Sequence, residues 1–136
     1  MNTNQLASQL MIDEGKRNKI YADSVGKLTI GVGRNLTDGG VSDDEIMLML
    51  DNDIIKVCAD LDDHLPWWST LSDTRQQVLA NMCFNMGIQG LLGFKNTLEA
   101  IQEGRYDAAA NGMLASLWAR QVGARAQRLA EMMKNG

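Results

Sequence analysis

The sequence predicts an α+β fold that consists mainly of helices, with one small β-hairpin near the N-terminus. Apolar residues recur every three or four positions over most of the chain, whereas residues 19–37 are rich in glycine and β-branched side chains. The chain has 136 residues, the length of one domain, and at this size about 65–70% of the unfolded chain's surface becomes buried. We therefore expect a single domain, residues 1–136.

The first element that the sequence predicts is a short N-terminal helix. Leu6, Leu10 and Met11 have helical spacing, Thr3 can cap the N-terminus, and Gly15 can end the helix. We expect this helix to run from about residue 4 to residue 14.

A small glycine-rich hairpin follows the helix. Leu28, Ile30 and Val32 alternate with small or polar residues, and the residues from Ser24 to Gly26 favour a turn. This pattern predicts a hairpin lobe over about residues 15–40.

A long amphipathic helix is the most strongly patterned element. Ser42 and Glu45 form a capping-box pattern, apolar residues then recur every three or four positions as far as Leu65, and Pro66 ends the pattern. We expect one helix over about residues 42–65, which connects the hairpin lobe to the rest of the chain.

The remaining residues predict a helical lobe over about residues 66–136, which we expect to include the N-terminal helix. Ser72 can cap a helix that Gly87 closes. Shorter helices are expected at about 95–103, 106–116 and 124–134, with the region from Trp118 to Gly123 between the last two.

Composition excludes several classes of function. Lys and Arg number 13 against 17 Asp and Glu, and this net charge of −4 argues against a nucleic-acid partner. The single histidine, His64, has no second histidine at ligand spacing, so we expect no catalytic triad, no metal site and no cofactor. No signal peptide and no apolar run of the ~18 residues of a membrane span is present, so we expect no membrane anchor.

The two cysteines lie in apolar segments that are typical of buried thiols. Cys58 and Cys83 are expected to be a reduced pair, and a disulfide between them stays open as an alternative.

Carboxylates are the remaining candidates for chemistry. Glu14 lies where a predicted helix meets Gly15, Asp23 lies at the hairpin turn, and Thr29 lies on the following strand. Two carboxylates in different environments can serve as proton donor and as base, which is the minimum that glycoside hydrolysis needs. Because 17 acids supply many such pairs, spacing alone is weak evidence.

The exact residues are more specific. The run IDEGKRNKIYADSVGKLTIGVG, residues 12–33, contains Glu-Gly, then Tyr-x-Asp, then Gly-x-x-Thr-Ile-Gly-x-Gly. It resembles the signature of the phage-type lysozymes, the muramidases of glycoside hydrolase family 24. NMCFNMG at 81–87, GFKNTL at 93–98 and SLWARQVGARAQR at 116–128 extend the resemblance over nearly the whole chain, in the order found in T-even phage lysozymes. The resemblance implies a two-lobed fold with a sugar-binding cleft between the hairpin lobe and the helical lobe.

The resemblance also implies roles for individual residues. Glu14 matches the general acid, Asp23 matches the second carboxylate, and Thr29 matches the hydroxyl that holds the hydrolytic water with Asp23 in an inverting mechanism. The residues that match positions contacting the saccharide are Asn35, Phe84, Asn85, Thr97 and Arg125. Arg125 is further expected to pair with the catalytic glutamate across the cleft. Phe84 and Trp118 fit a purely structural place in the core equally well.

The activity implied is hydrolysis of the β-1,4 bond between N-acetylmuramic acid and N-acetylglucosamine in bacterial peptidoglycan. We expect a monomeric endolysin that waits in the host cytoplasm until it is released to the periplasm and cell wall at lysis. A virion or tail-associated lysozyme used at infection, and an inactive glycan-binding module, are the alternatives. One departure from the family is Arg34, where a histidine is common, and the short LTDGG segment at 36–40 predicts a minimal hairpin lobe.

Overall fold

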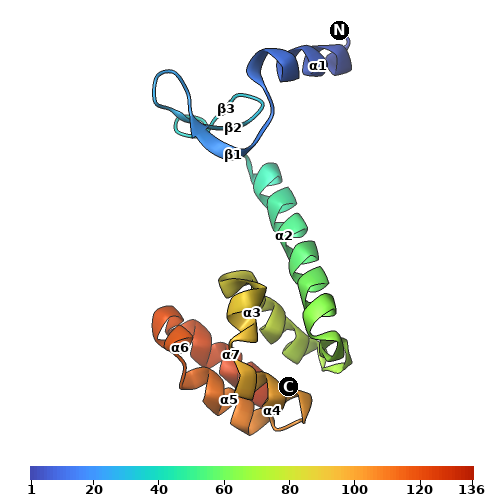
Figure 1. Cartoon of the computed structure of the whole chain (residues 1–136), viewed down its shortest axis with the longest axis vertical. Coiled ribbons are helices and arrows are strands. Elements are labelled where there is room, and N and C mark those ends of the chain that lie inside the picture. Colours follow the sequence, from blue (N-terminus) through green and yellow to red (C-terminus); the bar gives the residue numbers. More distant parts are fainter. The chain divides into compact units, whose positions relative to one another are not determined.

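The computed structural model describes all 136 residues and confirms a mainly helical α+β fold (Figure 1). In chain order the elements are α1 (Thr3–Glu14), β1 (Arg17–Ala22), β2 (Leu28–Gly31), β3 (Arg34–Asn35), α2 (Asp43–His64), the 3-10 helix η1 (Pro66–Thr70), α3 (Asp73–Leu92), α4 (Lys95–Gln102), α5 (Tyr106–Leu114), α6 (Leu117–Val122) and α7 (Ala124–Asn135). The chain divides into two compact units, residues 1–48 and 49–136, and the boundary falls within α2.

The first unit begins with α1, which is capped one residue earlier than predicted. Asn2 Oδ1 accepts a hydrogen bond from the Gln5 amide at 3.0 Å. Thr3 is already the first helical residue, so the prediction that Thr3 caps the helix was wrong. The helix ends at Gly15, as predicted, and none of its residues is buried. The expected inclusion of this helix in the helical lobe stays a prediction.

A turn joins β1 to β2 close to where the sequence predicted it. The Gly26 amide donates to the Asp23 carbonyl at 3.0 Å, and the Asp23 amide donates to the Lys27 carbonyl at 2.9 Å. Across the two antiparallel strands Tyr21 lies opposite Thr29. The turn therefore places residues 23, 27 and 29 next to one another.

A third strand extends the predicted hairpin into an antiparallel sheet of order β1-β2-β3. β3 has only two residues, and its Asn35 pairs with Thr29 of β2. Gly31 and Gly33 both have positive φ, 69° and 67°, which lets the chain reverse within a few residues. A strand this short shows no alternation of apolar and polar residues, so the sequence did not predict it.

An ion pair ties β3 to the N-terminus of α2. Arg34 Nη1 lies 2.7 Å from Glu45 Oε1. The same Glu45 oxygen accepts a hydrogen bond from the Ser42 amide at 2.9 Å, while Ser42 Oγ accepts one from the Glu45 amide at 3.2 Å. These two bonds confirm the predicted capping box.

The second unit is built around one apolar core to which the C-terminal half of α2 and helices α3, α4, α5 and α7 contribute. Its largest fully buried side chains are Leu61, Val78, Leu79, Met82, Leu91, Ile101, Met113, Leu129 and Met133. α5 packs against both α4 and α7, and α3 also packs against α7. No helix of the chain combines the length and the hydrophobicity that a membrane span requires.

The helix ends of the second unit follow the predicted signals in part. Ser72 Oγ accepts a hydrogen bond from the Arg75 amide at 3.2 Å, which confirms the predicted cap of α3. Gly87 interrupts the helical geometry with a φ of 77°, as expected, but helical structure resumes beyond it as far as Leu92.

Two short helices were not predicted. η1 begins at Pro66, where the sequence predicted only the end of the long helix, and α6 occupies the region from Trp118 to Gly123 that was expected to separate helices. The cap of α6 is Ser116, whose Oγ accepts from the Ala119 amide at 3.2 Å. Elements this short carry too little apolar periodicity to be predicted.

Both cysteines of the second unit are free thiols. Cys83 is buried, and this burial, together with the charge of Asp60, raises the pKa of its thiol. A raised pKa keeps the thiol protonated and unreactive.

The pair of Arg34 and Glu45 predicts a dependence of stability on acidic pH. The hydrogen bond from Arg34 and those from Ser42 lower the pKa of Glu45 from 4.5 to about 2. A carboxyl group whose pKa is lower in the folded state contributes stability above its unfolded pKa and loses this contribution as the pH falls through its folded pKa. Glu45→Gln should therefore be less stable than the wild type at pH 7, and the difference should shrink between about pH 4.5 and pH 2.

The measurement is urea unfolding of both proteins at pH 7, pH 4 and pH 2. Glu99→Gln, which changes an exposed glutamate of α4 outside the three ion pairs, is the matched control and should differ little from the wild type. A deficit of Glu45→Gln that is equally large at pH 2 and pH 7 would contradict the assignment.

Candidate active site

Glu14 lies at the end of α1, and its side chain contacts the turn between β2 and β3. A Cβ atom on Gly33 would lie only 2.9 Å from Glu14 Oε2 and 3.3 Å from Glu14 Cβ. Glycine at position 33 therefore leaves the space that the Glu14 carboxyl group occupies. Glu14 is exposed, so its carboxyl group can reach a ligand from this position.

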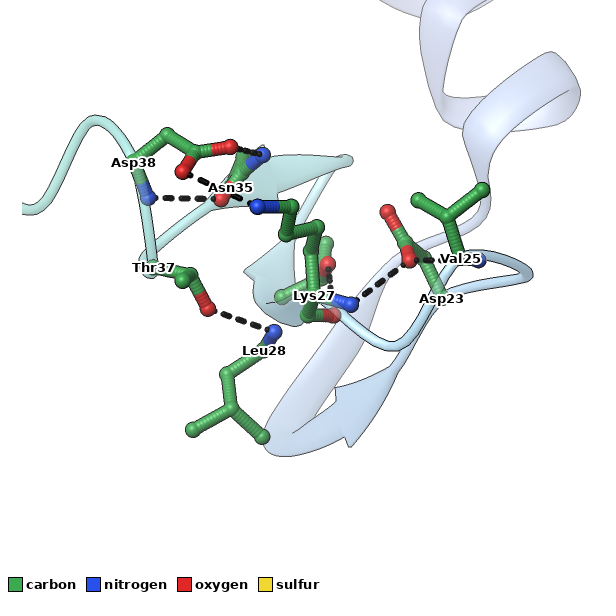
Figure 2. Close-up of polar contacts among 8 residues, drawn as sticks. Asp23, Val25, Lys27, Leu28, Asn35, Thr37 and Asp38 are labelled. Carbon is green, nitrogen blue, oxygen red and sulfur yellow. Dashed lines mark hydrogen bonds and ion pairs between the residues drawn. The ribbon is translucent and has the colours of Figure 1, made fainter.

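Asp23 follows β1, and its carboxylate closes the turn between β1 and β2 (Figure 2). Its Oδ1 accepts hydrogen bonds from the Val25 amide at 3.0 Å and from the Lys27 amide at 2.8 Å. Because both bonds go to Oδ1, the carboxylate has a defined orientation and Oδ2 stays available for a water molecule or a ligand.

Thr29 is the one buried residue among the three predicted catalytic positions, with 4% of its surface exposed. Its Oγ1 donates a hydrogen bond to the Lys27 carbonyl at 3.1 Å. The Asp23 amide donates to the same carbonyl at 2.9 Å. Since the hydroxyl hydrogen is used, Thr29 Oγ1 can only accept a further hydrogen bond. Lys27 thus joins Asp23 and Thr29 through its main chain.

Asn35 lies opposite Thr29 in the sheet, and Asp38 holds its side-chain amide (Figure 2). Asn35 Nδ2 donates to Asp38 Oδ2 at 2.9 Å, and the Asp38 main-chain amide donates to Asn35 Oδ1 at 3.0 Å. Asp38 Oδ1 also lies 3.2 Å from Lys27 Nζ. The first unit therefore brings together the predicted residues Asp23, Thr29 and Asn35 around Lys27.

A pocket of about 360 Å³ lies in the second unit and includes two of the predicted saccharide-contacting residues, Phe84 and Arg125. The residues that line it are Leu50, Ile54, Val57, Gln77, Ala80, Asn81, Phe84 and Arg125. Phe84 is 46% exposed, so its ring is not part of the core.

Arg125 is held at this pocket by Asn81 of α3. Arg125 Nε and Nη2 both donate to Asn81 Oδ1, at 3.0 and 2.7 Å. Arginine has no acceptor, so the amide oxygen of Asn81 must face it. The expected pairing of Arg125 with Glu14 stays a prediction.

Asn85 has a fixed side-chain orientation for a similar reason. Trp118 Nε1 donates to Asn85 Oδ1 at 2.8 Å. Because an indole only donates, the two amide hydrogens of Asn85 stay free, and Asn85 itself is exposed. Trp118 is 6% exposed and packs edge to face against Phe94, so of the two aromatic residues with open roles Trp118 belongs to the core.

Thr97 lies apart from the Phe84 pocket. It is 7% exposed on α4, and a Cβ on Gly112 of α5 would lie 2.5 Å from its Oγ1. The structure therefore places this hydroxyl in the contact between α4 and α5. Its assignment as a saccharide contact stays a prediction from the resemblance.

The chain matches a known protein family over most of its length. The family model described as phage lysozyme matches residues 12–134. The chain belongs to the phage lysozyme family. It is 29% identical over 159 residues to the pre-baseplate central spike protein Gp5 of Enterobacteria phage T4, a match that covers 96% of this chain and 28% of that protein. It is 24% identical over 161 residues to the probable T4-type lysozyme 1 of Dictyostelium discoideum, with 96% of this chain and 94% of that protein covered. The chain therefore spans less than a third of the spike protein.

Sequence reasoning missed three residues that hold predicted site residues: Lys27, Asp38 and Asn81. Asn81 lies four positions before Asn85 on α3 and within the motif NMCFNMG, so its place on the same helix face was a usable signal. Lys27 acts on Asp23 and Thr29 through main-chain atoms, which no residue type reveals. The structure contains no group of three or more His, Cys, Asp or Glu side chains that could hold a metal ion.

The contact of Gly33 with Glu14 predicts a loss of lysozyme activity in Gly33→Ala. The added Cβ would displace the Glu14 carboxyl group, and alanine at a φ of 67° costs about 1–2 kcal/mol of stability. Gly40→Ala is the matched control, because Gly40 has a φ of 60° but open space around its Cβ position. Both variants should lose similar stability in urea unfolding, and Gly33→Ala alone should lower kcat. Equal kcat values for the two variants would contradict the positioning of Glu14 by Gly33.

Proposed function

We propose that this phage lysozyme hydrolyses the β-1,4 bond between N-acetylmuramic acid and N-acetylglucosamine in bacterial peptidoglycan, by acid–base glycoside hydrolysis with inversion. The observation that carries the proposal is the arrangement of Asp23 and Thr29 on the main chain of Lys27. This arrangement gives two acceptors for one water molecule, from a carboxylate and from a hydroxyl whose hydrogen is already used.

The hydrolytic water is oriented by these two acceptors. When one water O–H group donates to Asp23 Oδ2 and the other to Thr29 Oγ1, a lone pair of the water oxygen is left for the anomeric carbon. Asp23 then acts as base, since it can take a proton from the water as the new C–O bond forms. An inverting mechanism needs the two carboxyl groups ~6.5–9.5 Å apart, which leaves room for this water.

Glu14 is the general acid in this proposal. Cleavage of the glycosidic bond leaves negative charge on the departing oxygen, and a protonated Glu14 neutralises that charge by giving up its proton. The exposed position of Glu14 beside Gly33 supports this role, because a proton donor must reach the leaving oxygen.

We propose saccharide contacts for five residues. Phe84 offers an apolar ring face to a sugar ring, Asn85 offers two amide hydrogens, and Arg125 offers a positive charge next to the apolar pocket. Asn35 offers an amide hydrogen beside Thr29. For Thr97, the proposed saccharide contact rests on the family resemblance alone.

For the biological role we propose a monomeric endolysin that is held in the host cytoplasm and reaches the periplasm and cell wall at lysis. The likeness over 94% of the probable T4-type lysozyme 1 supports this role. A tail-associated role is the second candidate, because the chain is also similar to part of a central spike protein. Quantifying the chain in purified virus particles separates the two roles, since only the second places it in the particle.

Glu14→Gln should abolish the clearing of bacterial cells whose outer membrane has been permeabilised. Removing a general acid costs about 10²–10⁴-fold in rate, so turbidity should fall in the wild type and stay nearly constant in the variant. Glu99→Gln, which changes an exposed glutamate of α4, is the control and should clear the cells at the wild-type rate. Equal clearing by Glu14→Gln and the wild type would overturn the role of Glu14, and no clearing by the wild type would favour an inactive glycan-binding module.

A further inference from the structure

Both polar atoms of the Asn35 side chain, in the first unit, have a hydrogen-bond partner. Both atoms are bound by one residue, Asp38, through Nδ2 to the carboxylate and through Oδ1 to the main-chain amide. The partners are three positions apart along the chain, so a single tight turn after β3 forms both bonds. Figure 2 shows the two side chains facing each other.

This pair of bonds removes the ambiguity that a side-chain amide normally has. A flipped amide would place its nitrogen against the Asp38 amide, where two donors would meet, and its oxygen against the carboxylate, where two acceptors would meet. Only one orientation is therefore compatible with Asp38. One hydrogen of Nδ2 is used by the carboxylate, and the second hydrogen is left in a fixed direction.

Lys27 connects this amide to the predicted catalytic residues. Its Nζ lies 3.2 Å from Asp38 Oδ1, while its main-chain groups bind Asp23 and Thr29. The ion pair is partly exposed, with 40% and 59% of the two side-chain surfaces accessible, so its contribution to stability is small. The ion pair matters for geometry, because it holds the Asp38 carboxylate beside the turn that also carries Asp23.

We propose that Asp38 is a positioning residue, which fixes the Asn35 amide so that its free N–H group donates to an acceptor oxygen of the glycan strand. This inference rests on the proposed function, because it names the substrate as a glycan. Asp38 does not touch the sugar itself. Asp38 affects glycan affinity through Asn35, and the ion pair with Lys27 helps to hold the Asp38 carboxylate in place.

A double-mutant cycle tests whether Asp38 acts through Asn35. Asn35→Ala, Asp38→Ala and the double variant are each made in the Glu14→Gln protein, and the Kd for soluble peptidoglycan glycan strands is measured by calorimetry. Loss of one hydrogen bond predicts that Asn35→Ala raises Kd about 3- to 10-fold. Asp38→Ala should raise Kd about 3-fold when Asn35 is present, and by less than about 1.5-fold when Asn35 is already alanine.

Further variants separate positioning from a general effect of charge or folding. Asp38→Asn can still accept from Asn35 Nδ2, so it should restore part of the lost affinity. Lys27→Met keeps the main-chain bonds to Asp23 and Thr29 and should raise Kd less than Asp38→Ala does. Asp63→Ala removes an exposed acid outside the three ion pairs and should leave Kd unchanged. In the Glu14 parent, Asp38→Ala should raise KM and leave kcat within about 2-fold.

Several outcomes would overturn the inference. The first is that Asp38→Ala raises Kd equally with and without Asn35. The second is that Asp38→Ala leaves Kd unchanged although Asn35→Ala raises it. The third is that Asn35→Ala itself leaves Kd unchanged. Absence of glycan binding by the parent protein also overturns it. By contrast, glycan binding that follows the predicted cycle, in a wild type that does not hydrolyse the glycan, would overturn the proposed hydrolase function alone and would support the positioning role of Asp38.

Discussion

The main chain of Lys27 is the constraint on which the candidate site of the first unit depends. Its amide donates to the Asp23 carboxylate, and its carbonyl accepts both the Asp23 amide and the Thr29 hydroxyl. The amide and the carbonyl of Lys27 therefore fix the Asp23 carboxylate, the turn between β1 and β2, and the buried Thr29 hydroxyl. Because buried polar groups are costly when they lack a partner, these bonds hold Asp23 and Thr29 in one arrangement.

Three side-chain amides, those of Asn35, Asn81 and Asn85, are held by partners that permit only one orientation. Trp118 only donates and so fixes the oxygen of Asn85, and Arg125 fixes the oxygen of Asn81 in the same way. Asp38 fixes Asn35 with a carboxylate on one side and an amide on the other. Fixed amides lose little further freedom when a ligand binds, which favours affinity for a polar polymer such as a glycan.

Those parts of the fold that have local chemical signals were predictable from the sequence. The Ser42 and Glu45 capping box and the Ser72 cap each depend on residues within three positions of each other, and both form as predicted. β3 and α6 were missed, because two and six residues carry too little periodicity. Asn2 caps α1 where the sequence predicted Thr3, because both residue types are good caps and the first helical residue decides between them.

The candidate site likewise contains residues that the sequence predicted and residues that it did not. Glu14, Asp23 and Thr29 were predicted because they match a family motif, and the structure gives each a defined place in the first unit. The residues that hold them were not found. Lys27 acts through main-chain atoms, and Asp38 has a role only because β3 and the turn after it form. Position in a motif identifies groups that do chemistry, whereas groups that orient them depend on the folded backbone.

The stereochemistry of the product tests most directly whether Asp23 and Thr29 hold a water molecule. Proton NMR recorded during the first minutes of hydrolysis of a soluble peptidoglycan strand distinguishes the α anomer from the β anomer before they interconvert. The arrangement on Lys27 predicts that the first product is the α anomer, because the water attacks from the face opposite the departing sugar. A first product with the β configuration would require two successive displacements at the anomeric carbon, and it would contradict the account.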